Sequence, residues 1–457
     1  MTRMTTRLAA TGLTCLSCLA WQPALAAGAD PAEQVRKLEE KLDRSLQLIE
    51  ALQRRVQQLE AANQEAKPAA PAEQANRIDA LEQQVSEMNS GLALRQADSG
   101  VPLHGFADIG LRRSGENNAY FGKGNKGFRI GSMDLYLTPQ FGDHVRMLIE
   151  PNIESDEAGN IGIDLERLQI GYVFNDRLTG WAGRFHTPYG YWNTAYHHGA
   201  QIQTSVLRPR FLDFEDKGGV LPAHTTGAWL TGATPTAGGR FGYDLFVGNS
   251  QRIRTDPSNL GSDSIIATGT LDMKMAGSGS ANAIAGLNAS FSPAAVAGLR
   301  LGVHAFGTDV AAVDSANKIL AQTRLKVAGG YVVYTNDDWE VMSEYYRFDN
   351  RDITGNTGSH RSSAWYAQAA RNWGLWTAYG RLEKAALDQG DSYFAYQTYG
   401  RSYSRGAIGL RYDLDPKAAL KLEFSHTRQQ DLVDRTTAMA VADDRYNLLL
   451  IQYAVRF

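Results

Sequence analysis

From about residue 101 to the end of the chain, apolar and polar residues alternate one by one. The last segment, RYNLLLIQYAVRF, places Leu449, Ile451, Tyr453, Val455 and Phe457 on one face. A period of two residues is that of a β-strand. The same pattern predicts sixteen strands, at 102–113, 127–141, 144–154, 161–174, 177–190, 226–236, 239–250, 282–292, 298–309, 322–335, 338–350, 361–372, 374–386, 405–414, 417–430 and 444–457.

The connections between these predicted strands alternate in length. Short ones such as GDH (142–144) and LDPK (414–417) alternate with long ones such as 114–126 and 387–404. Outer-membrane barrels have tight turns at one rim and long loops at the other. We therefore predict an all-β transmembrane barrel of about 16 antiparallel strands over residues 101–457. A soluble β-sandwich or propeller is the alternative, but it predicts neither the alternation nor the aromatic last residue.

A different period appears before the barrel. Residues 31–66 repeat apolar side chains every seven residues, with Val35, Leu42, Ile49 and Val56 at one heptad position. This repeat predicts an α-helical coiled coil, and a single amphipathic helix on another domain is the alternative. Prolines end the repeat, and residues 67–98 are predicted to be a linker with a short second helical segment.

Residues 1–26 are predicted to be a secretory signal peptide. They combine a basic start, a short apolar run and the cleavage pattern Ala24-Leu25-Ala26. Both cysteines lie in this segment, so the exported chain is expected to have neither a thiol nor a disulfide.

The sequence argues against several classes of function. A net charge of −3 does not fit a nucleic-acid-binding protein. The GKGNKG segment at 122–127 lies between two predicted strands, without the helix that a dinucleotide site requires. The histidines His186, His197, His198 and His224 have no diagnostic metal-binding spacing. We therefore expect neither an enzyme nor a bound cofactor or metal; a barrel hydrolase assembled from distant strands is a remote alternative.

Alternation also predicts which charged side chains face the barrel interior. A charge on the lipid face at mid-depth costs about 2–4 kcal/mol. In GWAGRFHTPYG, Trp181 and Phe185 are assigned to the outside, with Arg184 and His186 inside. The predicted pore-lining residues are Arg146, Arg167, Arg184, His186, Arg300, Arg324, Lys326 and Arg381. The alternative is that such charges only contact water and pair with one another.

The longest connection spans roughly 191–227, after the fifth predicted strand. A structureless loop of this length is usually functional. Its charged residues are candidates for a constriction: Arg208, Arg210, Asp213, Glu215, Asp216 and Lys217. A loop that packs over the mouth or against a neighbouring subunit is the alternative.

The predicted barrel, with GRFHTPYGYWN (183–193) leading into this loop, resembles the porin superfamily, most nearly the phosphate-selective porin O and P family. The resemblance implies a trimeric channel for small solutes, often anions, in a Gram-negative outer membrane, with the third external loop folded inside. The terminal Phe457 resembles the signal that the barrel assembly machinery recognises. The N-terminal coiled coil is similar to the periplasmic extensions of sucrose-type and dicarboxylate-type porins.

The function expected from these features is passive diffusion of small hydrophilic solutes, with weak anion selectivity. The expected partners are two further copies of the chain and outer-membrane lipid, although the coiled-coil residues weakly favour a dimer. The alternative is a structural or export barrel whose periplasmic coiled coil binds the peptidoglycan cell wall or an inner-membrane partner.

Overall fold

A computed structural model describes residues 103–115, 117–118, 122–123, 126–155, 161–196, 199–215, 219–255, 269–272, 282–355, 357–430 and 444–457. The expected signal peptide, coiled coil and linker lie outside the described residues and stay predictions, as do the expectations for His197, His198, Asp216 and Lys217.

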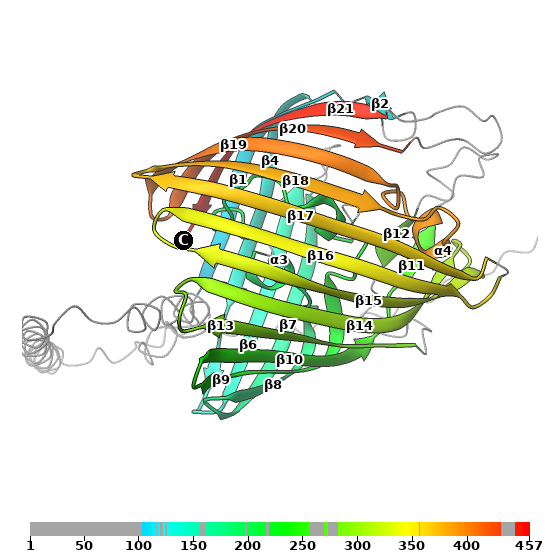
Figure 1. The fold of residues 1–457 in the computed structure, drawn as a ribbon, viewed down its shortest axis with the longest axis horizontal. Coiled ribbons are helices and arrows are strands. Elements are labelled where there is room, and N and C mark those ends of the chain that lie inside the picture. Colours follow the sequence, from blue (N-terminus) through cyan, green and yellow to red (C-terminus); the bar gives the residue numbers. More distant parts are fainter. Residues whose placement is uncertain are drawn as a thin grey trace, which may run out of the picture. The chain divides into compact units, whose positions relative to one another are not determined.

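Sixteen long strands among the described residues form one closed antiparallel barrel (Figure 1). They are β1 (Leu103–Ser114), β4 (Lys126–Leu137), β6 (Val145–Ser155), β7 (Ile161–Asn175), β8 (Leu178–His186), β9 (His224–Thr236), β10 (Gly239–Asn249), β13 (Ala283–Pro293), β14 (Leu299–Val313), β15 (Ile319–Thr335), β16 (Trp339–Asp352), β17 (Ser359–Trp373), β18 (Trp376–Ala386), β19 (Tyr403–Asp415), β20 (Ala418–Gln429) and β21 (Arg445–Arg456). The last strand pairs with the first, with Phe106 opposite Arg456 and Ser114 opposite Leu448. The predicted fold class is therefore confirmed.

Short elements complete the described structure. Strand β5 (Gln140–Phe141) continues β4 along β6, and β11 (Arg252–Thr255) pairs with β12 (Gly269–Asp272) beside the end of β14. Strands β2 (Asn117–Asn118) and β3 (Gly122–Lys123) pair with each other. The helices are α3 (Trp192–Ala195), the 3-10 turn η2 (Arg210–Leu212) and α4 (Ser392–Ala395). No helix among the described residues is long and apolar enough to cross a membrane.

The two rims differ as the sequence predicts. One rim carries only short turns, and three of them are fixed by a side chain that mimics a backbone carbonyl. Asn175 accepts from the N–H of Arg177 at 2.9 Å, and Asp415 accepts from the N–H of Lys417 at 2.6 Å. Asn336 accepts from the N–H of Trp339 at 2.7 Å. The opposite rim carries the longer connections, including residues 187–223.

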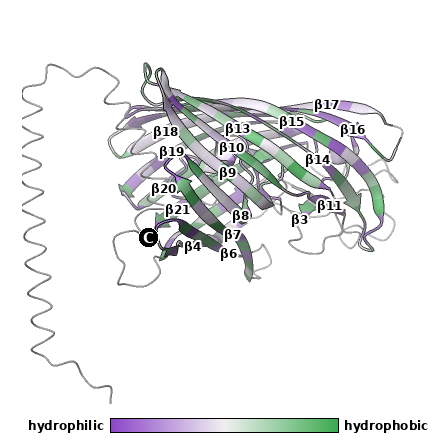
Figure 2. Cartoon of the chain, turned by 90° about the horizontal axis from the view of Figure 1, so that it is seen from below, coloured by the Kyte–Doolittle hydropathy of each residue, from purple (hydrophilic) through white to green (hydrophobic). Residues whose placement is uncertain are grey.

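Hydrophobic and hydrophilic residues follow one another along the strands, as the changes of colour in Figure 2 show. Ile170, Val303 and Ile408 point outward and are 55%, 58% and 65% exposed. Aromatic side chains near the short turns are also exposed, as a membrane-interface girdle requires: Phe141, Phe174, Trp339, Trp373, Trp376 and Phe457. The outer wall is therefore suited to lipid along most of its circumference.

Candidate pore and its inner loop

The described residues between 187 and 223, here called the inner loop, leave β8 and fold into the barrel. The loop first meets Glu344 of β16, on the opposite wall. The N–H groups of Tyr191 and Trp192 donate to the Glu344 carboxylate at 3.0 and 2.7 Å. The hydroxyls of Tyr346 and Tyr366 donate to the same carboxylate at 2.7 and 2.8 Å. Four donors thus converge on one buried acceptor.

The loop then descends to the rim of short turns. The Lys421 ammonium donates to the carbonyls of Ala200, Gln203 and Ser205. Arg411 donates to the carbonyl of Gln203 at 3.1 Å. The side chain of Gln201 also donates to the carbonyl of Pro416, in the turn between β19 and β20, at 3.3 Å.

The returning limb is bound along β18, β19 and β20. The N–H of Leu207 donates to Glu423 at 3.1 Å, and the N–H of Arg210 donates to Glu383 at 2.8 Å. Arg381 of β18 links the inner loop to the wall, donating to the Leu207 carbonyl at 2.7 Å and to Glu383 of its own strand at 2.9 Å. Breaking one partner of a buried pair like this costs about 3–5 kcal/mol. The inner loop is therefore a fixed part of the barrel interior.

Apolar side chains fill the space between the inner loop and the wall. Trp192, Phe211 and Leu221 of the loop belong to one buried cluster with Leu325 and Val327 of β15. This cluster reverses the sequence assignment for β15. Because Leu325 and Val327 face inward, their neighbours must face outward.

The prediction that Arg324 and Lys326 line the pore is therefore wrong. Arg324 is 52% exposed on the outer wall, paired with Asp309, and Lys326 is exposed on the same face. Trp181 and Phe185 are likewise wrongly assigned. Phe185 is fully buried in the inner cluster, and Trp181 stacks on Trp229, which donates to inward-facing Asp244 at 3.1 Å. In each case the alternation rule assumed a wet interior, whereas the inner loop supplies apolar partners.

Arg381, also predicted to line the pore, is 1% exposed beneath the inner loop. The loop arginines are buried as well. The Arg208 guanidinium lies 4.0 Å from the centre of the Phe214 ring, and Arg210 donates to Gln429 at 2.9 Å. These cations hold the loop in place and do not face an open pore. Asp213 is partly buried and accepts from the N–H of Phe214 at 3.0 Å.

A compact cluster of charged residues lies where the inner loop leaves and rejoins the wall. Arg167 donates to Glu150, and the His186 ring nitrogen Nε2 lies 3.6 Å from the same carboxylate. Arg184 donates to the backbone carbonyl of Glu166 at 3.0 Å, and its guanidinium lies 3.8 Å from the Glu166 carboxylate. The cations predicted at Arg167 and Arg184 are thus matched by local acids.

His224 joins this cluster to the inner loop. Its ring nitrogens lie 2.7 Å from Glu166 and 3.0 Å from Glu215. Burial alone would raise the pKa of Glu215, but His224 and the hydrogen bonds it donates hold that pKa below its ordinary value. Sequence reasoning missed Glu166 because a register shift between Glu150 and Pro151 interrupts the alternation on β7.

The opposite wall, β1 to β7, is not covered in this way. Glu150, Glu166 and Asp134 are buried there, but six other inward-facing charged side chains are partly or largely exposed: Asp108, Arg112, Arg129, Arg146, Glu154 and Asp164. The inner loop bonds instead to β16, β18, β19 and β20. Solvent therefore reaches the barrel interior along the first strands.

Four arginines surround the interior at the rim of short turns. Arg146 on β6, Arg240 on β10, Arg300 on β14 and Arg456 on β21 occupy inward-facing positions close to that rim, and each is partly exposed. Arg300 lies 5.8 Å from the Tyr191 ring of the inner loop. Two of the four, Arg146 and Arg300, are among the predicted pore-lining residues. We call this set the rim arginines.

Solved structures share this architecture. The anion-selective porin from Comamonas acidovorans is 12% identical, with a TM-score of 0.50, and the match covers 78% of this chain and 99% of that one. Outer-membrane expressed OmpT of Vibrio cholerae is 11% identical over 78% of this chain and 97% of that one, with a TM-score of 0.48. Salmonella typhi OmpF is 10% identical over the same shares, with a TM-score of 0.45.

At these identities the likeness to the Comamonas porin shows a porin fold and nothing about solutes. No protein-family model matches the sequence, and no curated protein was found to match it.

Proposed function

We propose that the chain forms a passive channel for small hydrophilic solutes in the outer membrane of a Gram-negative bacterium. The observation that carries the proposal is the one-sided inner loop, bound along β16 to β20, beside exposed inward charges on β1 to β7. A barrel that only anchored the cell envelope would not need a wet wall opposite a fixed loop. Planar-bilayer recording tests this, and a sealed barrel would favour the structural or export alternative.

The same channel is proposed to prefer anions weakly. The rim arginines support this, because a ring of fixed positive charge concentrates anions in a narrow mouth. Asp244 and Glu340 also occupy inward positions near this rim and limit the preference. Arg167 and Arg184 contribute less than their charge suggests, because Glu150 and Glu166 neutralise them.

The zero-current potential across a salt gradient measures this preference. Charge reversal by Arg146→Glu with Arg240→Glu should shift it towards cations, with unchanged barrel folding, because both side chains are partly exposed. Lys384→Glu, which reverses an outward-facing cation on β18, is the matched control and should leave the potential unchanged. Cation preference in the parent, or no shift in the double variant, would show that the rim arginines do not set selectivity.

The remaining assignments are also proposals. The GRFHTPYGYWN motif supports a relationship to the phosphate-selective porin O and P family, and that resemblance supports a homotrimer. Mass measurement in mild detergent, with and without residues 31–98, tests the trimer; a dimer that becomes monomeric on deletion would contradict it. A periplasmic coiled coil, a cleaved signal peptide and recognition of Phe457 by the assembly machinery complete the proposal.

A further inference from the structure

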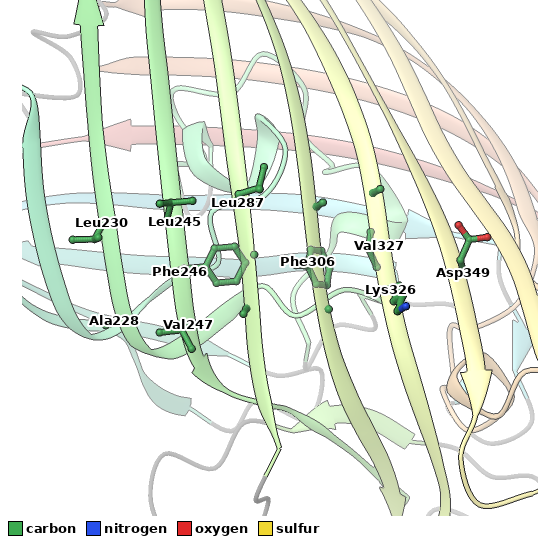
Figure 3. Close-up of a pocket in the computed structure, with 15 residues that line it drawn as sticks. Ala228, Leu230, Leu245, Phe246, Val247, Leu287, Phe306, Lys326, Val327 and Asp349 are labelled. Carbon is green, nitrogen blue, oxygen red and sulfur yellow. The ribbon is translucent and has the colours of Figure 1, made fainter.

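The outer wall has a groove that crosses the neighbouring strands β9, β10, β13, β14 and β15 (Figure 3). Its floor is formed by outward-facing Ala228, Ala285, Ala305, Gly307 and Ala328 on β9, β13, β14 and β15. Larger apolar side chains on β9, β10 and β13 flank it, namely Leu230, Leu245, Val247 and Leu287. The concavity has a volume of about 870 Å³. Its shape and lining suit hydrocarbon chains.

One end of this groove is charged. Lys326 and Asp349 line it there, at the right of Figure 3. The same two residues line a second concavity of about 410 Å³, shared with Arg324, Arg351 and Arg361. The apolar groove therefore runs directly into a cationic pocket on the same face of the wall.

The pocket carries excess positive charge. Asp349 is 2.8 Å from Arg347 and 3.0 Å from Arg361, and Asp309 pairs with Arg324 at 2.9 Å. With Lys326 and Arg351 this makes five cations against two carboxylates. Within the described part of the chain, Lys326 and Arg351 have no ion-pair partner. Two cations are thus available to an anion.

The height of both features in the wall identifies the side of the membrane. A tilted strand rises about 2.5 Å along the barrel axis per residue. Ala328 lies seven residues from the short-turn end of β15 at Thr335, and Lys326 lies nine. These separations correspond to about 17 and 22 Å in an apolar band about 25 Å tall. The groove lies in the half of the band nearer the long loops, and the pocket lies at its boundary.

We infer that this groove and pocket together bind a lipid of the outer leaflet that carries a phosphomonoester head group. The acyl chains occupy the groove between Leu230 and Ala328, and the phosphate contacts Lys326 and Arg351. A phosphomonoester carries about −1.5 to −2 charges at pH 7, whereas a phosphodiester carries one, so the excess positive charge favours the monoester. The direction of the strands rests on the proposed function, with the short turns in the periplasm.

The test uses the full chain, purified in mild detergent and delipidated, with lipid titrated and counted by native mass spectrometry. The probes are lipid A bearing its phosphates, the same lipid after phosphatase treatment, phosphatidylglycerol and inorganic phosphate. Phosphorylated lipid A should bind most tightly. Lys326→Gln with Arg351→Gln should weaken it by at least about tenfold, because each contact to a charged phosphate is lost without replacement.

The matched control is Lys384→Gln with Arg428→Gln, which removes two outward-facing cations at similar heights on β18 and β20. This control should bind as the parent does. Ala305→Phe fills the middle of the groove from outside and should weaken the lipid while leaving the pocket charges intact.

Several outcomes would overturn the inference. If the parent and the Lys326/Arg351 variant bind phosphorylated lipid A equally well, the cationic pocket does not recognise the lipid. Inorganic phosphate that displaces the lipid at comparable concentration would indicate a simple anion site. If Ala305→Phe dissociates an oligomer but leaves lipid binding unchanged, the groove is an interface between subunits and not a lipid site. Lipid binding and conductance are measured in separate experiments. A barrel that binds the lipid but does not conduct would therefore refute the proposed channel function and leave the lipid site standing.

Discussion

Glu344→Gln tests whether the inner loop depends on a single carboxylate. The carboxylate accepts from two loop N–H groups, those of Tyr191 and Trp192, and from two tyrosine hydroxyls. In glutamine one oxygen becomes an NH2 group, which can only donate. A hydroxyl can rotate to accept from it, but a peptide N–H cannot. One loop N–H is therefore left without an acceptor in a buried site.

An orphaned buried donor costs about 1–3 kcal/mol. The three remaining hydrogen bonds to the side chain also weaken, because they no longer end on a charged group. We take this loss to be offset because a neutral amide costs less free energy to bury than a carboxylate. The substitution should then increase the fraction of molecules with a released loop about 5- to 150-fold. The barrel itself should stay folded, because its strand pairing does not involve this side chain.

Limited protease treatment of reconstituted protein measures exposure of the inner loop, and single-channel recording measures the accompanying change in conductance. Glu340→Gln, on the same strand, is the matched control. Glu340 accepts only from Thr204 and Gln368 among the described residues, at 2.9 and 3.1 Å. A glutamine there can keep its oxygen towards the Gln368 NH2 group and turn its own NH2 group towards the Thr204 hydroxyl, which can accept. If Glu344→Gln and Glu340→Gln behave alike in both assays, the reasoning about Glu344 is refuted.

Three further predictions concern other positions. Gly190 has a φ of 63°, and an added Cβ would collide with Glu344 and Tyr346. Gly190→Ala should therefore release the inner loop at least as strongly as Glu344→Gln does. Unchanged protease resistance of the loop would contradict this. Deletion of Phe457 removes two backbone hydrogen bonds to Gly105 and should cost about 1–3 kcal/mol of barrel stability. It should also strongly reduce the amount of barrel in the outer membrane. Normal levels of barrel there would argue against an assembly signal at Phe457. The fold lowers the pKa of Glu215, so ionised Glu215 stabilises the inner loop fully above the ordinary carboxyl pKa of about 4.3. This stabilisation is lost as the pH falls through the lower pKa of the folded state, and the loop should then be released. Glu215→Gln should remove this acid-induced release, which proteolysis at a series of pH values measures.

The strands could be predicted from the sequence because two independent patterns coincide. Alternation sets each strand, and turn residues such as Asn175 and Asp415 end it through their own hydrogen bonds. The closing pair of β1 and β21 follows from the terminal aromatic face. Boundaries moved by only a few residues, for example from 322–335 to Ile319–Thr335 on β15.

Alternation alone could not predict, on every strand, which side chains face the barrel interior. On β15 the apolar Leu325 and Val327 face inward because the inner loop provides Phe211 and Leu221 as partners. Alternation carries no information about a segment that arrives from elsewhere in the chain. The fate of Arg381 shows the same limit, since its partners Ser205 and Leu207 lie more than 170 residues earlier.

The attachment of the inner loop has a consequence for the order in which the protein is built. The loop precedes its partners in the chain by a long way: Trp192 and Glu344 are separated by 152 residues, and Ala200 and Lys421 by 221. None of these bonds can form until β16 to β20 are present, and contacts this distant are slow to form. A closed barrel would have to admit Trp192 and Phe211 past its rim. The loop is therefore expected to be enclosed as the later strands assemble around it, so that it acts as an internal template on which they gather.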